Sequence, residues 1–234
     1  MTRPLRLGVL TPSSNTALEP LTTAIVGTLP DASVHFSRFK VTEIALDAAA
    51  LGQFDDGNIL AAAELLADAK VDVIGWSGTS SGWLGFDRDR QLVERIRERT
   101  GIPATTAVLA LNELLAIRKI TRIGFVTPYT QDVQDRIVGN YRTLRHLGIR
   151  VNHDFAGVDP GTLRELMAAV ARERPQAITT FCTNLRAAQL APAFEREHGI
   201  PLLDTVSTTV WGMVRAAGRS PAAIEGWGGL FQWT

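Results

Sequence analysis

The chain has 234 residues, of which 45% are hydrophobic and 21% charged, so it is long enough to bury a full core and too apolar to be disordered. Its 24 basic and 24 acidic side chains cancel, which excludes the strongly basic surface typical of nucleic-acid-binding proteins. One cysteine forms no internal disulfide, and no segment has the length of a membrane span or the pattern of a secretion signal. We therefore expect a cytoplasmic protein. Its expected partners are small molecules rather than nucleic acid or membrane, and a homo-oligomer remains possible.

Short β-rich runs alternate along the chain with longer segments of helical composition, the pattern of βα units around a mostly parallel sheet. The runs typical of strands are, in chain order, 5–12, 33–41, 71–76, 122–128 and 176–181. Apolar residues recur at helical spacing between them, at 57–70, 88–101 and 162–175. The predicted fold class is therefore α/β. The charged part of the second helix, 87–99, is predicted to be a solvated face with intrahelical ion pairs.

Three sequence features occur twice, in the same order. RLGVLTPSSN is repeated as RIGFVTPYTQ, VDVIGWSGTS as PQAITTFCTN, and ERTGIPATTAVLALNELLAI as REHGIPLLDTVSTTVWGMVRAA. The offsets between the copies are 116, 104 and 98 residues, so the second copy is shorter while the order is kept. Chance matches do not keep their order, so the pattern indicates an internal duplication.

The repeat divides the chain into two pseudo-symmetric halves, 1–118 and 119–217, each predicted to be a mostly parallel sheet flanked by helices. The carboxyl-terminal tail, 218–234, is expected to cross back to the first half. Functional groups in open parallel sheets collect at the carboxyl ends of the strands. The loops after the repeated strands therefore predict one cleft between the halves, formed by 11–15, 77–82, 127–131 and 181–184.

The only cysteine, Cys182, lies in the last of these loops. Superposing the repeats pairs it with Gly78 and pairs Thr183 with Thr79. A helix is predicted to begin near Asn184, and a helix amino terminus favours a thiolate. Free cysteine is also among the most buried residue types, so a reactive thiol and an ordinary core residue both remain open here.

The four loops resemble those of the Asp/Glu racemase superfamily, in the branch of maleate isomerases, arylmalonate decarboxylases and ectoine-utilisation proteins. VLTPSSNTALEP is similar to the first loop of the isomerases, and SGTSSGWLG resembles the corresponding loop of the decarboxylases. TPYTQDVQDRI resembles the third loop and FCTNLRA the loop that carries the second-half cysteine. The resemblance implies a small carboxylate or dicarboxylate substrate bound between the halves, with no metal and no organic cofactor.

The resemblance also implies roles for particular residues. Two-cysteine members place one thiol on each side of the substrate, and Gly78 stands here where the first is missing, as in the decarboxylases of the branch. Cys182 is then the catalytic residue of a decarboxylase-like, one-sided proton transfer, whose protonation is set by Thr183 and the helix near Asn184. The residues implied to bind the substrate carboxylate are Ser14, Asn15, Thr79, Ser80, Tyr129 and Thr183. The segment 151–166 is shorter than its family counterpart, which leaves the role of Asn152 unassigned.

Several alternatives remain at this stage. A maleate isomerase-like or racemase-like reaction would need another group in place of the first thiol, and a carboxylate-binding protein without turnover would need none. GTSSG fits the G-x-S-x-G pattern of a serine hydrolase with Ser80 as nucleophile, but His198 and Asp204 follow in the wrong order for its partners. The four histidines show no metal-ligand spacing. Trp76 and Trp83 flank the glycine loop, where they either shape the pocket or pack beneath it.

Overall fold

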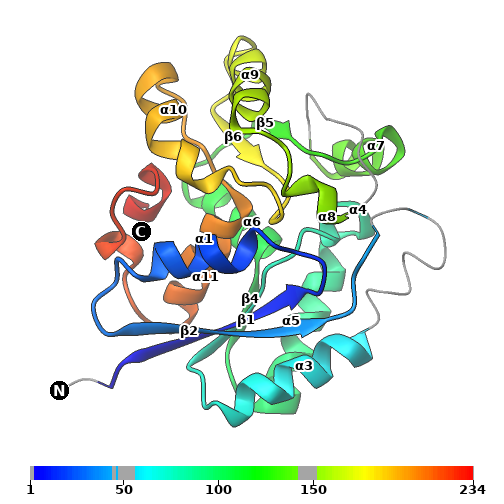
Figure 1. Cartoon of the computed structure of the whole chain (residues 1–234), viewed down its shortest axis with the longest axis vertical. Coiled ribbons are helices and arrows are strands. Elements are labelled where there is room, and N and C mark those ends of the chain that lie inside the picture. Colours follow the sequence, from blue (N-terminus) through cyan, green and yellow to red (C-terminus); the bar gives the residue numbers. More distant parts are fainter. Residues whose placement is uncertain (1–2, 44–45, 47–55, 142–151, 234) are drawn as a thin grey trace.

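The computed structural model describes residues 3–43, 46, 56–141 and 152–233, and within them strands pair in parallel to form two sheets (Figure 1). The first sheet has four strands in the order β2-β1-β3-β4, and the second pairs β5 with β6. An isolated bridge between Ile178 and Leu202 lies beside the second sheet. The predicted α/β class is confirmed. The strands are β1 Leu5–Pro12, β2 Ala32–Phe39, β3 Val73–Trp76, β4 Ala104–Thr106, β5 Ile123–Val126 and β6 Ala177–Thr180.

The described helices flank these sheets. In chain order they are α1 Leu18–Val26, α3 Asp56–Asp68, α4 Ser81–Leu84, α5 Phe86–Thr100, α6 Ala107–Ile117, α7 Gln131–Asn140, α8 Asn152–Phe155, α9 Pro160–Ala171, α10 Ala191–His198 and α11 Thr205–Ala216, with 3₁₀ turns η1 Ala188–Leu190, η2 Pro221–Ala223 and η3 Gly229–Gln232. Helices α3 and α5 contact each other and the first sheet, and α1 and α11 do so on its other side. Helix α9 covers the second sheet. None of the helices in the described part of the chain combines the length and apolar composition needed to cross a bilayer.

Every predicted strand run forms a strand, and the three named helical patterns form α3, α5 and α9. On α3, the apolar residues Ile59, Ala63 and Leu66 are buried as their spacing indicates, whereas Ala69 lies beyond the helix and is exposed. Strand β4 was not predicted, because Ala104–Thr106 gives only three residues and no apolar run. Its pairing with β3 comes from tertiary packing rather than from a local signal.

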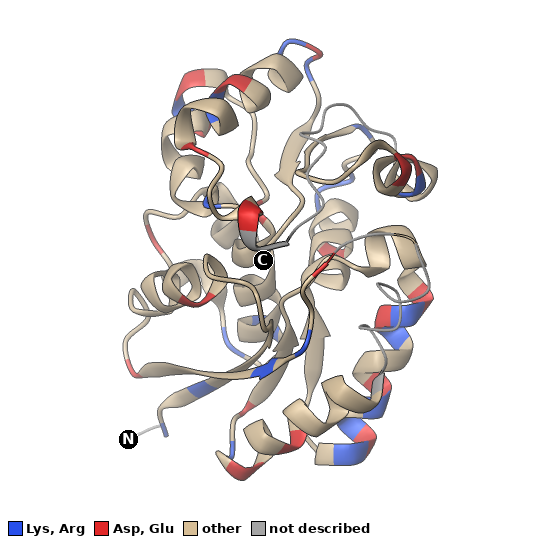
Figure 2. Cartoon of the chain, turned by 45° about the vertical axis from the view of Figure 1, so that its right-hand side comes forward, with Lys and Arg blue, Asp and Glu red and all other residues tan. Residues whose placement is uncertain are grey.

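The charged helix α5 is a solvated helix, as predicted. Leu92 and Ile96 face the core, while ion pairs join Arg97 to Glu94 at 2.6 Å and Arg90 to Asp87 along its exposed side. Basic and acidic residues alternate along the outer helices without forming a face of one sign (Figure 2). Along the described residues of these helices, there is therefore no continuous run of positive charge of the kind that attracts a nucleic-acid backbone.

One acidic residue of α5 is buried. Asp89 is 2% exposed, accepts a hydrogen bond from the hydroxyl of Thr106, and has its pKa raised from 3.8 to about 6 by burial. Because this pKa is raised in the folded state, its contribution to stability is full below pH 3.8 and is lost as the pH rises through about 6. At neutral pH the buried charge therefore destabilises the fold.

We expect Asp89→Asn to raise the free energy of unfolding by about 1–3 kcal/mol at pH 8, with the difference narrowing toward pH 4.5. Urea unfolding of both proteins at the two pH values measures it. Asp87→Asn, on the exposed side of the same helix, is the control and should show no such pH-dependent gain. A less stable Asp89→Asn variant at pH 8 contradicts this expectation.

The two sheets share helix α11. Although α11 belongs to the second copy of the repeat, it packs on β3 and β4 of the first sheet and on α6. The approach is close because glycines lie at the contacts: a Cβ on Gly75 would lie 2.3 Å from Met213 Sδ, and one on Gly212 would lie 2.6 Å from Ala110 Cβ. The first sheet therefore packs on a helix that begins, along the chain, after the last strand of the second sheet.

The carboxyl-terminal tail contacts several parts of the molecule. The indole nitrogen of Trp211 in α11 donates to the carbonyl of Trp233 at 2.9 Å, and the guanidinium of Arg219 donates to the carbonyl of Arg3 at 3.3 Å. The backbone nitrogen of Gly229 donates to Glu195 in α10 at 2.8 Å. The division of the chain at residue 118 into two domains and a tail stays a prediction.

Candidate active site

Segments from the two copies of the repeat meet at helix α4, directly after the loop of β3. The Asn140 amide of α7 donates to the carbonyl of Gly82 at 3.0 Å, and a Cβ on Gly82 would lie 2.5 Å from the ring of Phe181. Because β1 and β3, like β5 and β6, are parallel pairs, the loops at their carboxyl ends gather at this junction. This contact brings the β3 loop against the segment that follows β6.

A small cavity of about 20 Å³ lies at this junction, with room for about one water molecule. All four of the predicted loops contribute to it. Its lining is Pro12, Val41, Trp76, Gly78, Thr79, Ser80, Trp83, Tyr129, Cys182 and Thr183. Six of the predicted site residues are therefore brought together from the loops of both copies of the repeat.

Cys182 lies two residues beyond the end of β6 and is 3% exposed. Burial raises the pKa of its thiol to about 12 and the charge of Asp204 adds to the rise, whereas hydrogen bonds from Tyr129 and from the backbone of Asn184 and Leu185 act to lower it. At neutral pH the sulfur is therefore a protonated thiol. Such a group donates a proton rather than acting as a nucleophile.

The predicted helix near Asn184 is wrong. The chain turns after Cys182, and the next helical residues are those of η1 and α10, from Ala188 onward. The side-chain oxygen of Asn184 instead accepts hydrogen bonds from the backbone nitrogens of Thr16, at 3.0 Å, and Ala17, at 3.2 Å, ahead of α1. Within this described segment, no helix begins at Cys182 to favour a thiolate.

Hydroxyl groups lie beside the thiol. The hydroxyls of Thr79 and Tyr129 share a hydrogen bond of 2.6 Å, and Tyr129 also hydrogen-bonds to Cys182. Burial raises the pKa of Tyr129 well above its ordinary value, so its hydroxyl stays protonated. Ser80 also lines the cavity and adds a third hydroxyl to it. The Thr183 hydroxyl donates to the carbonyl of Ser77 at 3.0 Å and so ties the cysteine loop to the β3 loop.

Ser14 and Asn15, the other two predicted ligands of the carboxylate, do not line the cavity. The Ser14 hydroxyl donates to the carbonyl of Val41. The Asn15 side-chain oxygen accepts from the backbone nitrogens of Ala17 and Leu18, because the first turn of α1 needs acceptors there. The Asn15 amide also donates to the Thr183 hydroxyl at 3.3 Å, so Asn15 helps to hold a residue of the cavity without lining it. Asn152 begins α8, but its side chain lies outside the described residues.

The position of the missing first thiol is filled by an indole. A Cβ on Gly78 would lie 2.0 Å from Cζ2 of Trp76, which leaves no room for any side chain. Trp76 is 1% exposed and its ring packs on Phe39, with the ring centroids 5.0 Å apart. The glycine is therefore required by the close approach of the tryptophan. Both readings of Trp76 hold, since it packs under the loop and forms a wall of the cavity.

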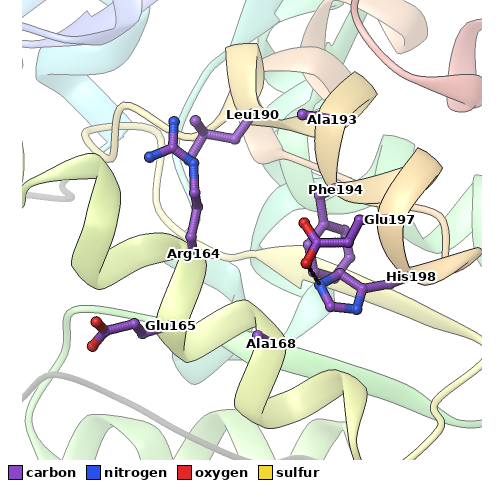
Figure 3. Close-up of a pocket in the computed structure, with 8 residues that line it drawn as sticks. All are labelled: Arg164, Glu165, Ala168, Leu190, Ala193, Phe194, Glu197 and His198. Atoms are coloured by element: carbon purple, nitrogen blue, oxygen red, sulfur yellow. Dashed lines mark ion pairs between the residues drawn. The ribbon is translucent and has the colours of Figure 1, made fainter.

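A larger hollow of about 240 Å³ lies between α9 and α10 and contains His198 (Figure 3). Its lining is Arg164, Glu165, Ala168, Leu190, Ala193, Phe194, Glu197 and His198. The imidazole lies 3.7 Å from a carboxylate oxygen of Glu197 and against the ring of Phe194, and it does not line the cavity that contains Ser80. The other histidine with a described side chain, His35, bonds to Ser33. The serine-hydrolase alternative therefore finds no base beside Ser80 among the described side chains.

Comparison with known proteins identifies the family. The arylmalonate decarboxylase family model matches residues 22–231. The chain is 30% identical to the arylmalonate decarboxylase of Bordetella bronchiseptica, covering 68% of this chain and 70% of that protein. It is 27% identical to a maleate isomerase of Pseudomonas putida, over 98% of both chains.

Solved structures show the same fold. The maleate isomerase Iso from Pseudomonas putida S16 superposes with a TM-score of 0.89 at 24% identity, over 98% of both chains. A crystal structure of arylmalonate decarboxylase superposes with a TM-score of 0.79 at 25% identity, over 98% of this chain and 100% of that one. From the sequence match and the shared fold, we conclude that this chain belongs to the arylmalonate decarboxylase family of enzymes, within the Asp/Glu racemase superfamily.

Proposed function

We propose that this protein decarboxylates a small dicarboxylate of the malonate type without a cofactor, and that Cys182 is its single proton donor. The observation that carries the proposal is the difference between the two paired loop positions, Cys182 and Gly78. Cys182 lines the cavity as a buried, protonated thiol, whereas at its counterpart in the repeat the indole of Trp76 covers Gly78. A racemase or a two-thiol isomerase needs an acid–base group on each side, and an indole supplies neither an acid nor a base at neutral pH.

In the proposed reaction the bond between the α-carbon and one carboxylate breaks, and that group leaves as CO₂. The bonding electron pair passes to the α-carbon and into the retained carboxylate, which becomes an enediolate. The S–H bond of Cys182 then breaks as its proton adds to the α-carbon on one face. The resulting thiolate regains a proton from water, so the enzyme returns to its starting state.

The residues around the cavity suit this sequence of steps. The hydroxyls of Thr79, Ser80 and Tyr129 supply hydrogen-bond donors where charge develops on the retained carboxylate. Pro12, Val41 and Trp83 give the cavity an apolar wall, which suits neutral CO₂ better than the charged carboxylate from which it forms. A thiol whose pKa is about 12 keeps its proton at neutral pH until a basic carbon is formed beside it.

An isomerase-like reaction is the second candidate. It is favoured by the match to a maleate isomerase over 98% of the chain, whereas the match to the decarboxylase covers 68%. It is disfavoured by the indole at the first thiol position, because an isomerase that adds a nucleophile to its substrate needs a sulfur there and this chain has none.

The test is to incubate the protein separately with phenylmalonate, methylmalonate and maleate and to follow CO₂ and all organic products by NMR. The proposal expects CO₂ and a monocarboxylic acid in equal amounts from a malonate. Fumarate from maleate without CO₂ would instead establish the isomerase reaction. Saturable binding of these acids with no product would establish a binding protein without turnover.

A further inference from the structure

We propose that Asp204 is a positioning residue for Cys182, which fixes the end of β6 through Thr180 and holds a buried negative charge there that disfavours a second negative charge on the sulfur. The inference rests on the proposed function, in which the protonated form of Cys182 is the active one. In the sequence, Asp204 is a poorly placed partner for a serine nucleophile, because it follows His198. Its surroundings in the fold give it a different role.

Asp204 is fully buried at the amino terminus of α11, and it has no cationic partner among the described residues. One of its oxygens accepts from the backbone nitrogens of Val206, at 2.9 Å, and Ser207, at 3.3 Å. The other accepts from the hydroxyl of Thr180 at 2.6 Å. The carboxylate is thus held by three neutral donors, so its charge is stabilised without being cancelled.

These bonds fix the strand end from which Cys182 projects. Thr180 is the last residue of β6 and lies two positions before Cys182. Its hydroxyl bonds to Asp204, and its carbonyl accepts from the hydroxyl of Thr205 at 3.0 Å. The start of α11 therefore holds Thr180 through both its side chain and its backbone.

The same helix also reaches the opposite loop of the cavity. The hydroxyls of Thr209 in α11 and Ser77 lie 3.3 Å apart, and the carbonyl of Ser77 accepts from Thr183. The β3 loop and the cysteine loop are therefore both attached to the first turns of α11. Asp204 caps this helix and bonds to Thr180, two residues before the cysteine.

The charge of Asp204 acts on the sulfur because both groups are buried, where charges are screened less than in water. Burial raises the pKa of Asp204 to about 6, so above pH 7 it is mostly ionised. A carboxylate nearby disfavours formation of a second negative charge, which raises the pKa of Cys182. The ionisable side chains that act on the sulfur are Tyr129, whose hydroxyl donates toward it, and Asp204, which opposes its ionisation.

The chain contains a matched control for the capping role of Asp204. Asp159 caps α9 in the same way, accepting from the backbone nitrogens of Gly161 and Thr162 and from the Thr162 hydroxyl. Asp159 is exposed, however, and it does not line the cavity. Replacing it tests the loss of a helix cap without the loss of a buried charge.

The experiment is the rate of alkylation by iodoacetamide between pH 7 and 10, followed by mass spectrometry, which reports this sulfur alone because the chain has one cysteine. We expect Asp204→Asn to be alkylated about five- to tenfold faster than the wild type at pH 8, because a lower thiol pKa increases the thiolate fraction. Asp159→Asn should react at the wild-type rate. An unchanged rate in a folded Asp204→Asn protein overturns the proposal.

A second variant separates charge from packing. Asp204→Glu keeps the negative charge but adds a methylene to a closed site, so it loosens the fold at least as much as the asparagine does. We expect it to react within about twofold of the wild type. Equal acceleration in both variants overturns the proposal, because it would trace the effect to loosened packing. Near-UV circular dichroism of the tryptophans verifies the fold, and since no substrate is used, the result stands apart from any failure of the proposed reaction.

Discussion

Replacing Cys182 by alanine is expected to lower kcat by about 10²- to 10⁴-fold on any malonate that the wild type decarboxylates, which is the usual contribution of a general acid. The physical reason is that the enediolate then has no protein proton donor on the thiol side. Binding of the carboxylate should change little, because its proposed donors are Thr79, Ser80 and Tyr129, which remain in place. Stopped-flow CO₂ release and calorimetric titration measure the two quantities separately.

Cys182→Ser is the companion variant, because it keeps the size of the side chain and replaces the thiol with a much weaker acid. It should be impaired nearly as strongly as the alanine variant. If either variant decarboxylates at the wild-type rate, Cys182 is not the proton donor. If binding is lost together with turnover, the sulfur acts in holding the substrate and the proposed division of roles is wrong.

The second large effect is expected at Gly78. Gly78→Cys alone should not supply a second acid–base group, because its Cβ would lie 2.0 Å from the Trp76 ring. We expect that variant to lose about 1–3 kcal/mol of stability from overpacking and to lose activity as the indole is displaced into the cavity. Combining it with Trp76→Leu removes the ring from that position. The double variant should then carry two thiols at the cavity and racemise a single enantiomer of a 2-arylpropionate.

Chiral chromatography of the product measures this result. Trp76→Leu alone is the control, and it should still give a single enantiomer. The control matters because enlarging the cavity also changes how the substrate lies. If Gly78→Cys alone is as stable as the wild type and forms both hands of the product, the indole does not exclude a second thiol, and the account of the glycine fails.

Local patterns predicted much of the fold. Buried parallel strands such as β1 and β5 are short apolar runs, and the internal repeat places the loops after them at one junction. Gly78, Thr79, Ser80, Tyr129, Cys182 and Thr183 lie together for this reason. The short strand β4 has no such run, so it was missed.

What the sequence did not predict depends on contacts between distant residues. Asn184 does not begin a helix, and its side-chain oxygen instead accepts hydrogen bonds from the backbone nitrogens of Thr16 and Ala17, which lie far away in the sequence. Asn15 has the polar side chain of a ligand but caps that helix. The spacing of Trp76 and Gly78 gives no sign that the ring folds back over the glycine. The bond of Asp204 to Thr180, two residues before the cysteine, forms only when the start of α11 meets the end of β6.

The central claim is that one protonated sulfur delivers one proton to one face of the substrate. The most direct measurement is the decarboxylation of a prochiral α-methyl-α-arylmalonate in D₂O, with the deuterium content and handedness of the product determined together. The account predicts one deuteron at the α-carbon, one hand of the product, and loss of this product in Cys182→Ala. A product of both hands from the wild type, or a single-handed product that persists without the sulfur, would contradict it.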